Sequence, residues 1–202
     1  IKIIFVCSPN NPTGSRLNNV KFLIENFNGI VALDEAYIDF RSDRTYLPKI
    51  QKYPNLIVMQ TFSKAWALAS ARVGVAYAQT EIISLLDKVK PPYNVSELNQ
   101  KAALEALGLK HETSDRISKI MNEKEFLVDE LEKLSIVKKV YPSDANFLLV
   151  EVSDANSIYN QLVDKKIITR NRHSQINNCL RITIGTYNEN RQLLWELKNI
   201  TV

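Results

Sequence analysis

The stretch IKIIFVCSPNNPTG, residues 1–14, joins an apolar run to a sharp turn. The run suits a buried strand because most of its residues are β-branched or aromatic, and the prolines and Gly14 that follow end that strand. The same combination of apolar run and turn recurs up to residue 78, in runs at 30–33, 56–60 and 73–78. Apolar residues at steps of three and four predict a crossover helix over 16–26. This alternation predicts an α/β fold built on a mostly parallel sheet.

The pattern changes after residue 90, where Pro91 and Pro92 interrupt any helix. The segment from Asn94 to Glu97 resembles a capping box, so a new helix is expected over 95–107, ending at Gly108. A long amphipathic helix follows, and after it the sequence predicts strands at 146–152, 167–169 and 180–184, a helix at 156–163 and a final helix opened by Thr186. We therefore expect two domains, 1–94 and 95–202, the second a small α+β unit.

Composition narrows the class of protein. Lys and Arg exceed Asp and Glu by 26 − 22 = 4, but the basic residues are scattered, which argues against a nucleic-acid partner. No apolar run approaches the roughly 20 residues of a membrane-spanning helix, and no leader pattern is visible, so we expect no membrane partner. Cys7 and Cys179 lack the spacing of a disulfide framework or a metal site, which favours a reducing compartment, the cytoplasm. The sequence starts without Met inside a strand, so we expect it to be part of a longer chain.

Polar side chains follow three of the apolar runs. Asn11 follows the first run and Asp34 and Tyr37 the second, while the third is followed by Thr61, Ser63, Lys64 and, further on, Arg72. Each alone has an ordinary explanation: a turn, a helix cap, a solvated lysine. Because the carboxyl ends of parallel strands meet at one edge of a sheet, we expect these side chains to form a site.

The chemistry of this set matches pyridoxal phosphate. A lysine amine can bond to an aldehyde, a carboxylate can keep a ring nitrogen protonated, and hydroxyl groups with an arginine can bind a phosphate. The sequence therefore predicts a cofactor site of this kind and no metal site.

The segments NNPTG (10–14), DEAY (34–37), TFSKAWALASARVG (61–74) and NCLRITIGT (178–186) together resemble the class I/II aminotransferases of fold type I. The resemblance is closest to the histidinol-phosphate aminotransferases and runs over essentially the whole chain, as the C-terminal portion of such an enzyme. It implies that 1–94 is the C-terminal part of the large, pyridoxal-phosphate-binding domain and 95–202 the small domain. One departure is that the family usually has glycines near Ala67 and Ser70.

The resemblance also implies a role for each candidate residue. Lys64 would bind the cofactor covalently and move protons, and Asp34 would hold the ring nitrogen; both are predicted to be catalytic. The other cofactor contacts would come from Asn11 and Tyr37 at the phenolic oxygen and from Thr61, Ser63 and Arg72 at the phosphate. Arg181 and Arg170 would bind the substrate.

By the same resemblance, the expected reaction transfers the amino group of histidinol phosphate to 2-oxoglutarate, forming imidazole acetol phosphate and glutamate in histidine biosynthesis, in a homodimer. Three alternatives stay open. One keeps the cofactor but changes the chemistry, to an aromatic or broad-specificity aminotransferase or a threonine-phosphate decarboxylase. Another is a non-catalytic ligand-sensing module on the same fold, and the third is an α/β domain without a cofactor.

Overall fold

The computed structural model describes residues 1–200, and of residues 42 and 43 only the backbone. The described chain forms two compact units. The first comprises Ile1–Pro9 and Arg16–Asp115, and the second comprises Asn10–Ser15 and the residues from Arg116 onward. The unit boundary thus lies inside a long helix, α4 (Lys110–Leu131). The expected domain boundary at residue 94 stays a prediction.

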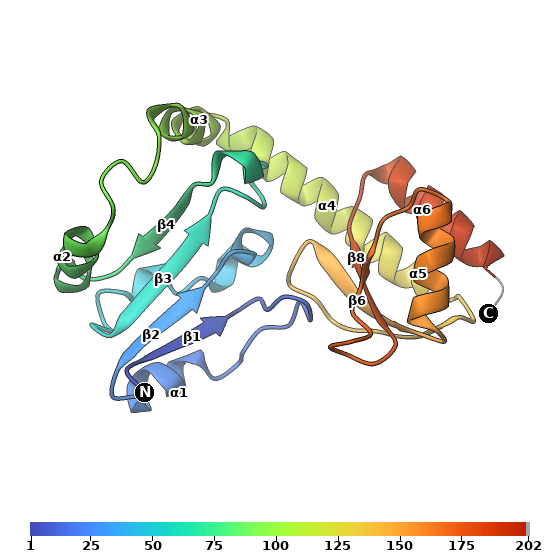
Figure 1. The fold of residues 1–202 in the computed structure, drawn as a ribbon, viewed down its shortest axis with the longest axis horizontal. Coiled ribbons are helices and arrows are strands. Elements are labelled where there is room, and N and C mark those ends of the chain that lie inside the picture. The colour runs from blue at the N-terminus through green and yellow to red at the C-terminus, as the bar shows by residue number, and fades with distance from the viewer. Residues whose placement is uncertain (201–202) are drawn as a thin grey trace. The chain divides into compact units, whose positions relative to one another are not determined.

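The first unit is built on a four-stranded sheet whose strands follow one another in chain order (Figure 1). Its strands are β1 (Ile3–Cys7), β2 (Ile30–Asp34), β3 (Leu56–Thr61) and β4 (Gly74–Tyr77). The first three are parallel, and β4 runs antiparallel to β3. The predicted α/β class with a mostly parallel sheet is therefore confirmed.

A compact apolar core covers one face of this sheet. Val20 and Ile24 of α1 (Val20–Asn26) pack there against Val31, Leu33 and Leu56. The predicted start of this helix at residue 16 is wrong. The backbone N–H of Leu17 donates to the Ser8 side chain at 3.1 Å, which ties this segment to the end of β1 and keeps it out of the helix.

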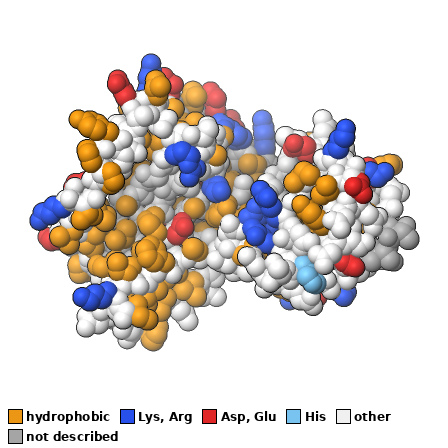
Figure 2. All heavy atoms as spheres, in the orientation of Figure 1, with side chains coloured by type: hydrophobic (Ala, Val, Ile, Leu, Met, Phe, Trp, Pro, Cys, Tyr) orange, Lys and Arg blue, Asp and Glu red, His pale blue; other side chains and the backbone are white. Residues whose placement is uncertain are grey.

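Apolar side chains remain exposed elsewhere on the first unit. Phe5 of β1 is 71% exposed and Ile3 is 49% exposed, and Figure 2 shows hydrophobic side chains gathered over this part of the molecule. The helix α2 (Thr80–Val89) has no buried residue. Since parallel sheets are normally covered on both faces, this surface is suited to packing against further polypeptide.

The helix predicted from residue 95 is α3 (Glu97–Gly108). Its cap is Ser96, whose side chain accepts the N–H of Asn99. The capping box expected from Asn94 to Glu97 is therefore wrong, because the helix begins two residues later and has Asn99, not a glutamate, at its third position. Short 3₁₀ turns complete the first unit at Ile38–Arg44, Leu47–Lys49 and Ala69–Ala71. Among the residues the structure describes, no helix combines the length and apolar character needed to cross a membrane.

The second unit is an antiparallel sheet packed with helices, as predicted. Its strands lie in the order β5 (Val137–Val140), β6 (Phe147–Val152), β8 (Cys179–Thr183) and β7 (Arg170–Asn171). Apolar residues of α4, α5 (Ala155–Asp164) and α6 (Tyr187–Asn199) form one core with this sheet, among them Leu127, Ile158 and Leu193.

The strand predicted at 167–169 is wrong, because pairing begins only at Arg170. The backbone N–H groups of Lys166 and Ile167 donate to the carbonyl groups of Val163 and Leu162, at 2.8 Å each. This segment therefore closes the end of α5 rather than joining the sheet.

The final helix opens at Thr186 as predicted, and Thr186 and Glu189 form a capping box at the start of α6. The Glu189 carboxylate accepts the backbone N–H and the hydroxyl of Thr186, both at 2.7 Å, and these bonds lower the pKa of Glu189 from its usual 4.5. We expect Thr186→Ala to lower the free energy of unfolding by about 1 kcal/mol, as measured by urea denaturation of the full-length protein.

The lowered pKa also predicts a pH dependence. The charged form of Glu189 is favoured in the folded state, so its contribution is complete above pH 4.5 and is lost as the pH falls through the lowered value. The stability difference between the wild type and Glu189→Ala should therefore narrow as the medium is acidified. Glu105→Ala, at an exposed glutamate of α3, is the control and should show no such narrowing.

Candidate active site

Asp34 is the last residue of β2. Its carboxylate is half-buried and has two hydrogen-bonding neighbours. Its Oδ1 accepts the backbone N–H of Ala36 at 2.9 Å, and its Oδ2 lies 3.9 Å from the Sγ of Cys7, the residue paired with it on β1. Desolvation, then the Asp34 charge and this contact, raise the pKa of the Cys7 thiol. Cys7 therefore stays protonated and can donate to Asp34, but it is a poor nucleophile.

A contact between Tyr37 and Lys64 joins the segments that follow β2 and β3. The ring of Tyr37 is buried, and the Nζ of Lys64 lies 5.3 Å from its centroid. A lysine ammonium at this distance is attracted to the ring face. The contact places the only amine among the predicted cofactor residues next to the loop that carries Asp34.

The polar residues after β3 share a cavity with Asp34. It has a volume of about 290 Å³, and the predicted site residues that line it are Asp34, Thr61, Ser63, Lys64 and Arg72. The Thr61 hydroxyl accepts the N–H of Ser63 at 3.1 Å and donates to the carbonyl of Val73 at 3.3 Å. The cavity thus combines a carboxylate, an amine, hydroxyls and a guanidinium.

The segment after Lys64 forms a loop followed by the short 3₁₀ turn Ala69–Ala71. The N–H of Ala67 donates to the Lys64 carbonyl at 3.1 Å and that of Leu68 to the Phe62 carbonyl at 3.0 Å, so the loop folds back on itself. The rings of Phe62 and Trp66 pack with centroids 5.5 Å apart. As a result Ala67 has a φ of 58°, in the left-handed region that favours glycine.

Asn11 lies in the second unit, with Arg181. The Nη1 of Arg181 donates to the Oδ1 of Asn11 at 2.7 Å. Gly14 holds this loop: the N–H of Asp144 donates to its carbonyl at 2.9 Å, and a Cβ at Gly14 would collide with the side chain of Ser143. Within this unit the loop joins a predicted cofactor residue to a predicted substrate residue.

Arg170 lies directly opposite Arg181 in the pairing of β7 with β8. Directly opposed residues of antiparallel strands project from the same face, and like charges there repel each other. The Arg181 guanidinium also lies 4.9 Å from the centroid of the Phe147 ring. Two arginines on one face of a sheet, one exposed and one half-buried, are suited to binding an anion.

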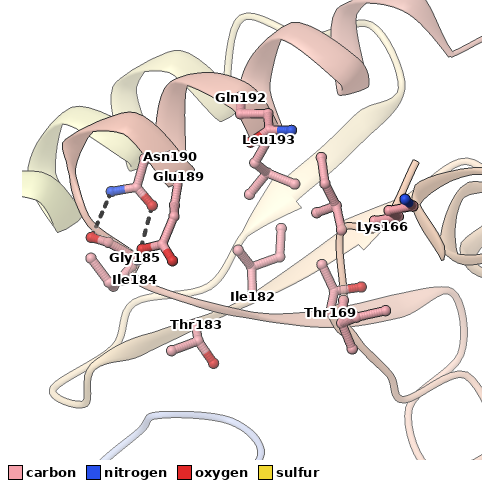
Figure 3. Close-up of a pocket in the computed structure, with 12 residues that line it drawn as sticks. Lys166, Thr169, Ile182, Thr183, Ile184, Gly185, Glu189, Asn190, Gln192 and Leu193 are labelled. Atoms are coloured by element: carbon pink, nitrogen blue, oxygen red, sulfur yellow. Dashed lines mark hydrogen bonds between the residues drawn. The ribbon is translucent and has the colours of Figure 1, made fainter.

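A larger cavity of about 490 Å³ lies elsewhere in the second unit, and none of the predicted site residues lines it (Figure 3). Two of its polar side chains, Glu189 and Asn190, hold the start of α6. Asn190 donates to the Gly185 carbonyl at 3.1 Å and accepts the Gly185 N–H at 2.9 Å, as the dashed lines show. This cavity does not gather the predicted chemistry.

Glu35, a residue that the sequence patterns did not predict to be important, is only 1% exposed. Its Oε1 accepts the N–H of Tyr46 at 2.7 Å, and its Oε2 accepts the Thr45 hydroxyl at 2.6 Å and the Gln60 amide at 3.0 Å. The available signal was the pair of adjacent carboxylates, Asp34 and Glu35, at the end of an apolar strand. Because successive side chains point in opposite directions, only one of the two can face the cavity.

Comparisons with known proteins agree on one family. The sequence model of the family described as aminotransferase class I and II matches residues 1–197. A histidinol-phosphate aminotransferase of Flavobacterium psychrophilum is 50% identical over 201 residues, which cover 98% of this chain and 58% of that relative. The chain thus spans little more than half the length of this curated relative.

Solved structures show the same fold. The histidinol-phosphate aminotransferase of Clostridium acetobutylicum matches with a TM-score of 0.91 at 23% identity, over 98% of this chain and 64% of that one. The histidinol-phosphate aminotransferase of Sinorhizobium meliloti, solved in complex with pyridoxal-5'-phosphate, matches with a TM-score of 0.86 at 25% identity. The match covers 98% of this chain and 56% of that one.

The left-handed backbone at Ala67 predicts a stabilising substitution. Ala67→Gly should raise the free energy of unfolding by up to about 1 kcal/mol, because glycine adopts a positive φ without the clash of a Cβ. Ala69→Gly, two residues on in a 3₁₀ turn, is the matched control and should lower it. Urea denaturation of both full-length variants measures the difference, and equal destabilisation by the two substitutions would contradict the prediction.

Proposed function

Because the chain belongs to the class I and II aminotransferase family, we propose that the full-length protein is a pyridoxal-phosphate-dependent aminotransferase acting on histidinol phosphate. It transfers the amino group to 2-oxoglutarate and forms imidazole acetol phosphate and glutamate. The observation that carries the proposal is the cavity that gathers Asp34, Lys64 and Arg72 at the ends of β2 and β3. The 50% identical relative supports the choice of substrate.

The donor set of the cavity fits the cofactor. An aldehyde needs an amine, which Lys64 provides, and a protonated ring nitrogen needs a carboxylate, which Asp34 provides. The Ser63 and Thr61 hydroxyls and the Arg72 guanidinium suit a phosphate. When bound, the cofactor supplies an aldehyde that takes up the amino group and a ring that accepts electrons from the substrate Cα.

The residues of this chain then orient the reactants and move protons. Asp34, held by Ala36 and Cys7, would place its carboxylate beside the ring nitrogen. The Nζ of Lys64 would take the proton from the substrate Cα and pass it to the carbon of the cofactor's former aldehyde group. Tyr37 contributes its hydroxyl to the phenolic oxygen, as we propose for Asn11 as well.

Arg170 and Arg181 bind the acidic groups of the substrates. Two guanidiniums on one face of a sheet can bind the phosphate of the amino donor and, in the second half of the reaction, the carboxylates of 2-oxoglutarate. The proposal also includes a homodimer and a cytoplasmic location. Light scattering of the full-length protein tests the first of these, and cell fractionation tests the second.

An absorbance spectrum of the full-length, pyridoxal-phosphate-loaded protein tests the reaction. The cofactor band should shift when histidinol phosphate is added without a keto acid, and return when 2-oxoglutarate is added. A band that responds to an aromatic amino acid instead would favour the broad-specificity aminotransferase. Release of carbon dioxide from threonine phosphate would favour the decarboxylase. A band that responds to no amine would favour a ligand-sensing module.

Replacing either catalytic candidate should abolish most turnover. We expect Lys64→Ala to lower kcat by about 10²–10⁴-fold, since a positioned proton carrier is lost, and Asp34→Ala by about 10²-fold or more, since charge stabilisation is lost. Lys49→Ala is the matched control, because Lys49 also lies over a tyrosine ring, that of Tyr46, at 4.2 Å. Normal turnover of Asp34→Ala would show that the assignment is wrong.

Arg170 should matter for the phosphorylated donor. Arg170→Gln removes a charged hydrogen-bond donor, so KM for histidinol phosphate should rise roughly tenfold or more. Arg172→Gln is the control on the same segment; Arg172 bonds to Gln175 and should leave KM unchanged. Steady-state kinetics measures both, and equal effects of the two changes would remove Arg170 from the substrate site.

A further inference from the structure

Glu35 is a buried carboxylate that the proposed reaction does not use. Its side chain accepts three hydrogen bonds, from the Thr45 hydroxyl, the Tyr46 N–H and the Gln60 amide, at 2.6, 2.7 and 3.0 Å. A carboxylate taken out of water is costly unless such donors replace the water. A residue with this cost and this many partners constrains the groups around it strongly.

The partners of Glu35 connect the two strand ends that form the cavity. Glu35 directly follows Asp34, and Gln60 directly precedes Thr61. The backbone N–H of Glu35 also donates to the carbonyl of Met59 at 2.8 Å. Successive side chains of a strand point to opposite faces, so Glu35 can join the two strand ends from the face opposite to Asp34.

A second carboxylate extends the connection to the lysine loop. Asp39 lies in the 3₁₀ turn after Tyr37. Burial raises the pKa of Asp39, the Trp66 side chain, two residues after Lys64, opposes the rise, and the Glu35 charge adds to it. The Nζ of Lys64 also lies 5.3 Å from the centroid of the Tyr37 ring, so the loop after β2 contacts the segment that carries Lys64.

We infer that Glu35 is a positioning residue, which holds the ends of β2 and β3 in the arrangement that presents Asp34 and Lys64 to one cofactor. This inference rests on the proposed function for the identity of the ligand. Its structural part, that Glu35 fixes the two strand ends, holds independently of which ligand binds. Glu35 itself need not touch the cofactor.

The test compares Glu35→Gln with Tyr53→Phe in the full-length protein. Glu35→Gln keeps the shape but turns one acceptor into an amide donor that faces the Thr45 hydroxyl and the Gln60 amide. Tyr53→Phe removes the bond from the Tyr53 hydroxyl to the exposed Glu25, at 2.9 Å, which is also a carboxylate bond in the first unit. Thr45→Val, which removes one donor only, serves as a milder variant should Glu35→Gln fail to fold.

Two readouts are measured. Hydrogen exchange of the cofactor-free protein should quicken by about tenfold in peptides covering 34–38 and 59–64 of Glu35→Gln, and less in Thr45→Val, with 147–152 unchanged. Titration with pyridoxal phosphate should show about tenfold weaker binding by Glu35→Gln. Tyr53→Phe should leave both local exchange and cofactor affinity at wild-type values.

The inference is overturned if exchange at the two strand ends stays at the wild-type rate in both variants, or if Tyr53→Phe changes exchange and affinity equally. A wild-type protein that binds no pyridoxal phosphate would refute the proposed function instead. In that case the exchange rates at 34–38 and 59–64 still decide whether Glu35 holds the strand ends.

Discussion

Parallel pairing of β1, β2 and β3 is the constraint on which the cavity depends. The register places Cys7 opposite Asp34 and Asp34 opposite Met59, so that the chain reaches Thr61 and Lys64 only a few residues beyond the level of Asp34. No side chain of the cavity has to reach far, because the backbone ladder delivers all three strand ends to one edge. Three polar residues there are then set in place by short local bonds: Asp34 accepts the N–H of Ala36, and Thr61 and Arg72 donate to the carbonyls of Val73 and Ala69.

The second unit uses a different device to position its polar residues. Residues 10–15 leave the first unit directly after β1 and are held by the Gly14 carbonyl, which accepts the N–H of Asp144. This approach is close enough that only glycine fits. Asn11 is consequently fixed beside Arg181, 170 residues away along the chain, by the hydrogen bond that the Arg181 guanidinium donates to it.

The sequence predicted the strands of the first unit well, and it grouped the residues Asp34, Thr61, Ser63, Lys64 and Arg72 that line the cavity, because apolar runs and the polar residues that follow them are local signals. Asn11 and Tyr37, which it placed in the same group, do not line that cavity. The sequence-based prediction failed where hydrogen bonds between residues far apart in the sequence determine the local structure. The hydrogen bond from Leu17 to the Ser8 side chain keeps residues 16–19 out of the helix. Hydrogen bonds to the end of α5 keep residues 167–169 out of the sheet. The strand β5 was missed because its centre is two exposed lysines, Lys138 and Lys139. Glu35 was missed because its role depends on Thr45 and Gln60, which no spacing connects to it.

The opposed arginines make ligand binding and sheet formation parts of one equilibrium. β7 has only two residues, and one of them is Arg170, which faces a like charge across the pairing. An anion held between the two guanidiniums removes that repulsion. If the anion binds only when β7 and β8 are paired, its binding free energy stabilises the pairing. Under the proposed assignment of Arg170 and Arg181 to the substrate, we expect backbone protection at the edge of this sheet to rise with substrate concentration.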